Sequence, residues 1–408
     1  MSTGTDLEYD PYDPVIDADP HPVWKRLRDE APLYRNDRYD FWALSRFDDV
    51  LAASTDWRTY SSARGTVLEM IDITTPPGQA PSDGDGGQGG GMMIFMDPPG
   101  HDDLRRLVNR AFTPRRVAAL EERVREMCAE LLDPRVDGSG FDYLYDFAAK
   151  IPTMAIGALL GVPKEDQDQL RIWGDWLMRY EPDGLSAEKA EAIGKLHEYL
   201  ASMIRDREAN PRDDMVSDLL AAEITVDDGT TRRLNRSEVH SFFTLLQLAG
   251  SETTARLLGW AAVLLARHPD QRAKLVADPG LIANAVEELL RYEAPSPIQA
   301  RFVTEDVEWH GRTVPAGSRL ALLTGSAGRD ERKYAEPDRF DVERHFDRHV
   351  TFGYGVHFCL GASLARLEGH LVLDETLRRF PQWSVDESAV ELVQTSTVRG
   401  PLKVPLTL

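Results

Sequence analysis

Cysteine and long apolar runs are scarce in this 408-residue chain. Its only cysteines are Cys128 and Cys359, which excludes a disulfide scaffold and any zinc or iron–sulfur site with four cysteine ligands. The apolar run closest to a membrane span, 257–266, is shorter than the ~20 residues that cross a bilayer. The N-terminus lacks the basic and apolar stretches of a secretory signal. We therefore expect a cytoplasmic protein without a membrane anchor.

Basic residues are also in deficit. The chain has 47 Lys and Arg against 68 Asp and Glu, a formal net charge of −21. A field of this sign repels nucleic-acid phosphates and anionic membranes, so nucleic acid is not an expected partner. Hydrophobic residues make up 42% of the chain, enough at this length to build a large core that encloses a cofactor.

Helical patterns dominate the sequence after residue 103, while strand patterns are short. Because helices and strands do not alternate at βαβ spacing, we expect a mainly α fold with small antiparallel β-sheets, and 1–408 as a single domain. One segment, 74–91, is rich in Gly, Pro and Asp and is interpreted as a flexible insert. The patterns predict helices at 115–132, 185–207, 281–292 and 362–379, a long helix from a capping box at Asn235 to before Pro269, and strands at 41–45, 301–303, 307–310 and 319–323.

Cys359 lies in the most constrained segment of the chain, Thr-Phe-Gly-Tyr-Gly-Val-His-Phe-Cys-Leu-Gly at 351–361. Gly353 and Gly355 permit positive φ and a close approach of the backbone to a ligand. The cysteine precedes an expected helix, whose N-terminus favours a thiolate, and a thiolate can ligate a soft metal centre. A lone cysteine is more often a buried structural residue, as we interpret Cys128, but the loop favours a ligand for Cys359.

Three weaker patterns accompany this loop. In the long helix, Gly250 is costly by ~1 kcal/mol relative to alanine, and a carboxylate beside a hydroxyl, Glu252 and Thr253, can relay protons. A solvated glutamate on a functionless kink explains that pattern equally well. Glu288 and Arg291 have the spacing of an ordinary helical ion pair. The third pattern is a group of cationic side chains that can together clamp cofactor carboxylates: His101, Arg105, Arg301 and His357.

In this order along the chain, the motifs resemble those of the cytochrome P450 family of haem-thiolate monooxygenases, from about residue 42 to the C-terminus. The resemblance implies the cytochrome P450 fold, in which haem b lies between a long central helix and a proximal cysteine loop. It makes Cys359 the axial thiolate ligand of the iron and gives Thr253 and Glu252 the catalytic role of steering protons. It also implies haem-binding roles for His101, Arg105, Ala249, Gly250, Arg301, Phe352, Gly353, His357 and Gly361.

The resemblance also implies partners. Electrons from NAD(P)H would arrive through a ferredoxin reductase and a ferredoxin, which we expect to dock on a basic cluster. Dioxygen and an apolar small molecule, such as a terpenoid, fatty acyl chain, steroid or polyketide, would be the substrates, and the protein would be a monomer. The expected pocket walls are 92–96, 246–249, Ile298 and Gln299. The basic cluster comprises Arg105, Arg106, Arg110, Arg115 and Arg116.

Alternative functions stay open at this point. A non-catalytic haem or lipid carrier can use the same pocket, although it has no need of the proton relay. A serine hydrolase using Ser363 is disfavoured because its motif requires a second glycine after the serine and a strand before it. A dinucleotide site at Gly353 and Gly355 lacks the third glycine.

Overall fold

The structure is a computed structural model that describes residues 7–71, 91–109, 112, 114–178, 186–225, 229–393, 395 and 397–408. The 74–91 insert, except Gly91, and Arg110 of the basic cluster lie outside these ranges. No helix in the described part of the chain is long and apolar enough to cross a membrane.

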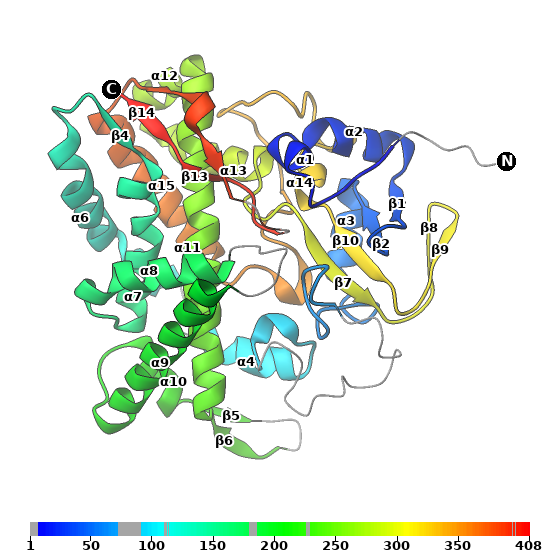
Figure 1. Cartoon of the computed structure of the whole chain (residues 1–408), viewed down its shortest axis with the longest axis horizontal. Helices are drawn as coiled ribbons and strands as arrows, with labels where there is room; N and C mark the ends of the chain where they lie inside the picture. Colours follow the sequence, from blue (N-terminus) through cyan, green and yellow to red (C-terminus); the bar gives the residue numbers. More distant parts are fainter. Residues whose placement is uncertain are drawn as a thin grey trace.

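A 32-residue helix, α11 (Arg236–Arg267), runs through the molecule and carries the other helices around it (Figure 1). The predicted capping box is confirmed: the Asn235 side chain accepts from the Glu238 backbone N–H, and the Glu238 carboxylate accepts from the Asn235 N–H. The helix ends at Arg267, ahead of Pro269, as expected. It is buried along most of its length because other elements pack around it.

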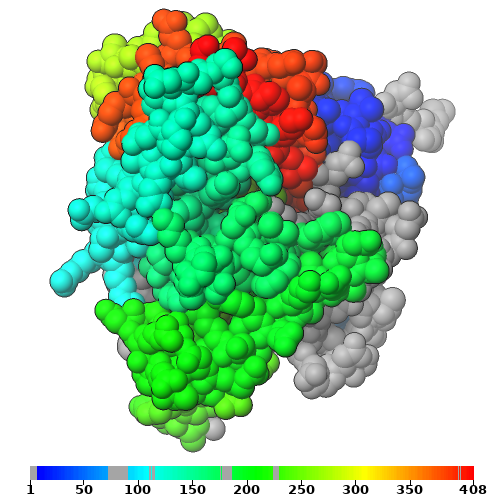
Figure 2. All heavy atoms as spheres, turned by 60° about the vertical axis from the view of Figure 1, so that its left-hand side comes forward, coloured from blue at the N-terminus to red at the C-terminus, as the bar shows by residue number. Residues whose placement is uncertain are grey.

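Figure 1 shows α6, α7, α8, α9 and α15 on one side of α11 and α1, α2, α3, α4 and α14 on the other. Helices α6 to α10 cover the face seen in Figure 2 in cyan to green. The predicted helix at 362–379 is confirmed at those bounds, whereas the one at 115–132 is two helices interrupted near Leu120. The helices other than α11 are α1 (Pro14–Ala18), α2 (His21–Glu30), α3 (Phe47–Thr55), α4 (Gly100–Val108), α5 (Pro114–Ala118), α6 (Glu121–Leu132), α7 (Lys150–Leu160), α8 (Lys164–Met178), α9 (Ala187–Ala209), α10 (Met215–Ala221), α12 (Pro269–Ala277), α13 (Ile282–Tyr292), α14 (Thr324–Ala327) and α15 (Ala362–Arg379).

The strands are short, as expected, and form small sheets. The largest sheet has the order β1-β2-β10-β7-β3 and lies on the opposite side of the molecule from α6 and α7 (Figure 1). The strands are β1 (Leu33–Asn36), β2 (Phe41–Leu44), β3 (Tyr60–Ser61), β4 (Gly140–Asp142), β5 (Glu223–Thr225), β6 (Thr231–Arg233), β7 (Gln299–Val303), β8 (Val307–Trp309), β9 (Arg312–Val314), β10 (Arg319–Leu322), β11 (Ser384–Val385), β12 (Glu391–Leu392), β13 (Pro401–Lys403) and β14 (Pro405–Thr407).

One strand pairing corrects the sequence expectation of purely antiparallel sheets. Strands β2 and β10 run parallel, with Phe41 opposite Arg319 and Leu44 opposite Leu322. More than 270 residues separate these strands along the chain, so a direction set by a hairpin does not apply to them. Their pairing depends on tertiary packing, which local patterns do not encode.

A buried ion pair fixes α13 against the segment that leads to the cysteine loop. The guanidinium of Arg291 donates to both oxygens of the Glu288 carboxylate, at 2.6 and 2.8 Å, and both side chains are 0% exposed. Arg291 also donates to the carbonyls of Gly328 and Pro337. Arg344 also donates to Glu288, at 3.2 Å. This network is structural, because it joins elements distant in sequence.

Removal of the Glu288 carboxylate should leave the Arg291 charge buried without its partner. We expect Glu288→Ala to lower the free energy of unfolding by ~3–5 kcal/mol, measured by urea denaturation. As a control, Lys25→Ala breaks an exposed ion pair with Asp29, at 2.7 Å, and should change that free energy by at most ~1 kcal/mol. Equal losses for the two variants would contradict the structural role of the buried pair.

Candidate active site

A cavity lies where α11 and α15 meet the cysteine loop. The space available in it to the centres of water-sized molecules is about 250 Å³. Its wall combines apolar side chains with a small number of polar groups, which is typical of small-molecule sites. The lining residues are Met93, Ile94, His101, Arg105, Phe112, Ile156, Leu245, Leu246, Ala249, Gly250, Thr253, Thr254, Leu257, Leu290, Pro295, Ser296, Gln299, Thr351, Phe352, His357, Cys359, Leu360, Gly361, Leu364, Ala365 and Glu368.

The cysteine loop closes on itself before α15 begins. The backbone N–H of Cys359 donates to the carbonyl of Phe352 at 2.9 Å. Gly353 and Gly355 have φ of 68° and 71°, in the left-handed region that favours glycine. At Gly355 a Cβ atom would also lie 2.9 Å from the Ser54 carbonyl oxygen. The two turns therefore require glycine, and they place the thiol at the start of α15.

Opposing influences act on the Cys359 thiol. Burial raises the pKa of this thiol above its ordinary value, and the backbone N–H groups of Gly361 and Ala362 and the charges of Arg105 and Arg366 oppose the shift without cancelling it. The N–H groups at the helix start act in the direction that the sequence indicated, but burial outweighs them in the protein alone. Cys128, which is fully buried in α6, has no such N–H groups beside it among the causes of its shift, and burial raises its pKa to about 12.

The α11 side of the cavity explains the glycine of the long helix. A Cβ atom at Gly250 would lie 2.9 Å from Cδ1 of Ile156, so glycine lets α7 pack closely against α11. The hydroxyl of Thr253 donates back to the carbonyl of Ala249 at 2.8 Å and also lines the cavity. The helix is continuous through these residues.

Glu252 is placed differently from Thr253. Its Oε1 accepts hydrogen bonds from Nε and Nη2 of Arg256, at 3.0 and 2.7 Å, and the side chains of both residues are buried. Arg256 donates in addition to the carbonyl of Pro401 at the start of β13. Glu252 is not among the residues that line the cavity.

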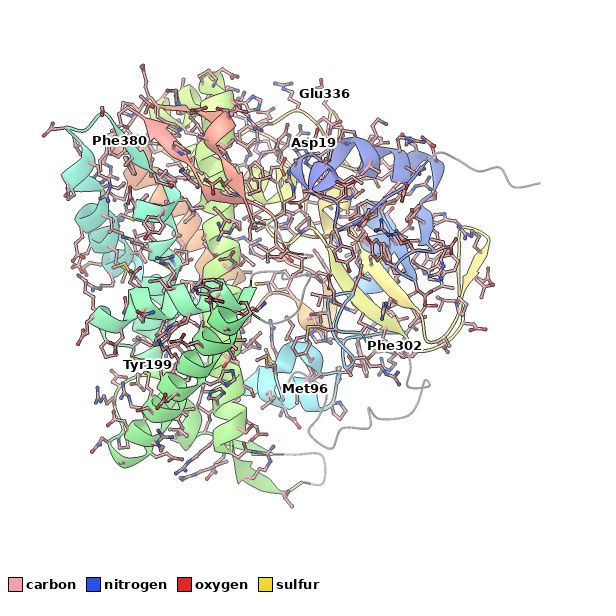
Figure 3. The ribbon with its side chains drawn as sticks, viewed as in Figure 1. Asp19, Met96, Tyr199, Phe302, Glu336 and Phe380 are labelled. Carbon is pink, nitrogen blue, oxygen red and sulfur yellow. The ribbon has the colours of Figure 1, made fainter. Side chains whose placement is uncertain are left out.

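The structure brings together the four side chains proposed as a clamp, His101, Arg105, Arg301 and His357. The rings of His101 and His357 are 4.5 Å apart between centroids. Burial, with the nearby charges of Arg301, His101 and Arg105, lowers the pKa of His357 to about 3, and its ring also hydrogen bonds the backbone of Met96. Figure 3 shows Met96 beside α4, on the other side of α11 from Tyr199 of α9. Nε2 of His357 is buried and has no partner among the described residues.

Arg301 and Gly353 are near the cavity without lining it. Arg301 is buried, which lowers its pKa to about 10, and it donates to the carbonyl of Ala300 and to Oε1 of Gln299. Every other residue assigned to the cofactor by the sequence lines the cavity. Of the expected wall residues, Met93, Ile94, Leu246, Ala249 and Gln299 line the cavity. The others do not: Met92, Phe95, Met96, Gln247, Leu248 and Ile298.

A brace behind the cysteine loop was not predicted. Arg366, in the first turns of α15, donates to both oxygens of Glu287 at 2.6 and 2.9 Å, and His349 contacts the same carboxylate at 3.1 Å. The guanidinium of Arg366 also lies over the ring of Phe352, 4.6 Å from its centroid. The three residues are distant in sequence, so no local pattern indicated the brace.

Glu368 was also missed. It lines the cavity from α15 although it was not considered from the sequence. Helical spacing was a usable signal, because Gly361, Leu364, Ala365 and Glu368 follow the i, i+3, i+4, i+7 pattern of one helix face. By contrast, Ser363, the hydrolase candidate, is exposed at the start of α15 and follows a loop rather than a strand.

Comparisons with known proteins show the family of the chain. The family model described as cytochrome P450 matches residues 155–278 and 280–407. The chain belongs to the cytochrome P450 family. It is a P450 monooxygenase, an oxidoreductase, and the family implies a haem-thiolate cofactor.

Similar proteins match the chain over nearly its whole length. A putative cytochrome P450 123 of Mycobacterium tuberculosis is 39% identical, over 99% of this chain and 97% of that protein. The vitamin D(3) 25-hydroxylase of Pseudonocardia autotrophica is 38% identical, over 100% of this chain and 98% of that protein. The solved structure of the P450 PksS from the Bacillus subtilis bacillaene polyketide synthase has a TM-score of 0.86 and 33% identity, covering 98% of this chain and 100% of that one.

The residues present fit a haem of this kind. A thiol, backbone N–H groups that favour its anion and an apolar wall lie around one cavity. At Gly361, a Cβ atom would meet nothing within 4 Å, which leaves room for a flat ring against the backbone. Nε2 of His357, which has no hydrogen-bond partner in the described part of the chain, lies near the charges of Arg301 and Arg105 and is suited to a propionate.

Proposed function

We propose that this P450 holds haem b through Cys359 and takes electrons from NAD(P)H by way of a ferredoxin reductase and a ferredoxin. It would hydroxylate or epoxidise an apolar small molecule such as a terpenoid, fatty acyl chain or steroid. The observation that carries the proposal is that the Cys359 thiol and the Thr253 hydroxyl line the same cavity, whose wall is otherwise largely apolar.

Haem with a thiolate ligand supplies the electron-rich iron that activates dioxygen. The chain's part is to hold and orient that group. Cys359 is the ligand, and the N–H groups of Gly361 and Ala362 stabilise its negative charge. Phe352 lines the cavity beside the sulfur and shields it, and Gly353 shapes the turn behind it. On the α11 side, Ala249 and Gly250 leave room for the ring face.

The propionates would lie among the side chains of His101, Arg105, Arg301 and His357. The guanidinium groups suit carboxylates because charge-assisted hydrogen bonds are short and strong, and a neutral imidazole can still donate one N–H. Arg105 already donates to the carbonyl of Phe358, next to the cysteine, so the same side chain connects the clamp and the loop. The haem would then be held at two independent points, by Cys359 at the iron and by these side chains at the propionates.

Thr253 is assigned the transfer of protons in the cavity. Its hydroxyl donates to Ala249 at 2.8 Å, which leaves its oxygen lone pairs free to accept from water. We assign Glu252, the residue before Thr253, the role of the carboxylate that exchanges protons with the Thr253 hydroxyl. Its ion pair with Arg256 must open before its oxygens reach the cavity.

The substrate is proposed to be apolar with one polar contact. Most of the side chains that line the cavity are apolar, while Ser296 and Gln299 add polar groups to its wall. A relative with the printed name vitamin D(3) 25-hydroxylase supports a polycyclic or terpenoid-like substrate. PksS, described as part of a polyketide synthase, supports a polyketide in the same position.

Ferredoxin would dock on the face next to the cysteine. The Phe358 side chain is 37% exposed there and offers an apolar contact one residue from the ligand. Arg105 and Arg106 on α4, and Arg115 and Arg116 on α5, add positive charge. Arg106 and Arg116 are partly neutralised by Asp103 and Asp218, so Arg115 is the residue chosen for a test.

The ligand assignment is tested by Cys359→Ser. We expect the reduced carbon-monoxide complex of this variant to lose its thiolate spectrum, because an alcohol oxygen does not replace the sulfur donor. Cys128→Ala is the matched control and should keep the spectrum, since Cys128 is buried in α6. A thiolate spectrum in Cys359→Ser would refute the proposed function.

Proton delivery is tested by Thr253→Ala. Haem content should be unchanged, coupled product formation should fall by ~10-fold or more, and the missing electrons should appear as hydrogen peroxide. The measurement compares NADPH consumed with peroxide formed, in the presence of a compound that shifts the haem spin state. Thr244→Ala is the control, because Thr244 makes the same bond to a carbonyl one turn earlier, at 3.0 Å, and does not line the cavity. If Thr253→Ala couples NADPH consumption to product formation as well as the parent does, Thr253 has no part in a proton relay.

Docking is tested by charge reversal at Arg115. At low salt, Arg115→Glu should be reduced by ferredoxin several-fold more slowly than the parent. Added salt should bring the two reduction rates closer together, because it screens the charges. Arg38→Glu makes the same change in net charge at an exposed site near the N-terminal strands and should leave reduction unaffected. Stopped-flow reduction under carbon monoxide measures both, and equal effects at the two sites would refute a local docking surface.

A further inference from the structure

Gln299 is a polar residue of the cavity wall, at the point where β7 begins. Its Oε1 accepts a hydrogen bond from Nη2 of Arg301, at 3.3 Å. Because a guanidinium group can only donate, the oxygen of the Gln299 amide, and not its nitrogen, must face Arg301. The contact with Arg301 thus fixes which way the amide is turned, and it directs Nε2 away from Arg301.

The amide nitrogen of Gln299 is a donor that lacks a partner. In the part of the chain that the structure describes, nothing accepts a hydrogen bond from Nε2. An amide nitrogen carries two N–H groups and cannot accept. When an apolar compound fills the cavity and displaces water, these N–H groups weaken its binding unless the compound itself brings an acceptor.

Ser296 offers a second donor on the same wall. Its Oγ is 3.4 Å from Oγ1 of Thr397, and Thr397 gives its own hydroxyl proton to the carbonyl of Ile298 at 3.0 Å. Since a hydroxyl has one proton, Ser296 must be the donor in its contact with Thr397. A distance of 3.4 Å is long for a bond between two hydroxyls, so a closer acceptor in the cavity can take over this proton.

We propose that the substrate carries a carbonyl oxygen, as in a ketone, ester or lactone, which accepts hydrogen bonds from Nε2 of Gln299 and from the Ser296 hydroxyl. The inference rests on the proposed monooxygenase function and narrows its substrate class. A carbonyl oxygen has two lone pairs and no proton, so it can serve both donors without adding a donor of its own. An alcohol would instead need Ser296 as its acceptor, which leaves the Ser296 proton on the long contact with Thr397.

The same two residues would orient the substrate. A carbonyl held at the wall limits the carbon atoms that can approach the iron to those at one distance from the carbonyl. Ser296 and Gln299 would therefore contribute to the choice of the oxidised carbon as well as to affinity.

The carbonyl class is tested with compounds that share a carbon skeleton: menthone, menthol and p-menthane, and the larger set androstanone, androstanol and androstane. Titration of the haem spin state in the parent gives the dissociation constants. In the set that fits the cavity, the ketone should bind ~10-fold more tightly than the hydrocarbon and several-fold more tightly than the alcohol. Equal binding of ketone and hydrocarbon, or no spectral shift with either ketone, would show that the inference is wrong.

Gln299→Glu tests the direction of the hydrogen bond. Glutamate keeps an oxygen toward Arg301 but replaces the N–H groups with an acceptor, so the ketone should bind ~10-fold more weakly and the alcohol should become the tighter ligand. Gln299→Met is the matched variant without polar atoms and should bring the ketone to the affinity of the hydrocarbon. The hydrocarbon itself should bind both the parent and Gln299→Met equally well. Parental affinity for the ketone in both variants would overturn the inference.

A haem propionate is the rival acceptor for Nε2, because Arg301 belongs to the proposed clamp. A crystal structure of the haem-loaded parent with the tighter-binding ketone distinguishes the two acceptors. We expect Nε2 of Gln299 within hydrogen-bond distance of the ketone oxygen and beyond that distance from both propionates. A bond from Nε2 to a propionate in this complex would assign Gln299 to the cofactor and exclude the substrate role.

These outcomes separate the inference from the proposed function. A thiolate spectrum of the reduced carbon-monoxide complex in the parent, combined with no preference for the ketone, refutes the Gln299 inference alone. A parent without that spectrum refutes the proposed function, and ligand-observed NMR with the same compounds then still compares ketone with hydrocarbon binding. If Gln299→Glu does not take up haem, the result for Gln299→Met decides.

Discussion

The placement of one sulfur atom at the start of a helix is the constraint on which the rest of this structure depends. The thiol of Cys359 is held by two left-handed turns that only glycine adopts easily, at Gly353 and Gly355. The loop itself is supported from behind: Arg366 ties α15 to Glu287 on α13, and α13 is anchored by the buried pair of Glu288 and Arg291. The support is layered, so the loop keeps its shape without relying on its own hydrogen bonds alone.

Much of this arrangement could be predicted from the sequence because it is local. The loop glycines, the capping box of α11 and the bounds of α15 each depend on neighbours within a few residues. The cationic group could also be predicted, although His101 and His357 are far apart in the chain, because the family resemblance joined them. The fold class followed from the same resemblance and from the absence of βαβ spacing.

The features that could not be predicted depend on contacts between distant segments. The parallel pairing of β2 with β10 and the brace of Glu287, His349 and Arg366 are of this kind. Glu252 shows the limit most clearly. Its spacing from Arg256 is that of a helical ion pair, yet only the fold shows that both side chains are buried and that Arg256 also reaches Pro401. The local sequence left a relay and a solvated glutamate equally open, the family resemblance implied the relay, and the packing adds a counter-ion.

The bond from Arg256 to the carbonyl of Pro401 joins the central helix to the C-terminal strand region. The same guanidinium also donates to Glu252, so one side chain contacts both β13 and the Glu252 carboxylate. Gly400 lies directly before β13, and a Cβ atom there would come within 2.6 Å of Cβ of Arg256. A side chain at position 400 would therefore displace Arg256 and weaken its bonds to both Pro401 and Glu252, so this glycine preserves the connection between the central helix and the C-terminal strands.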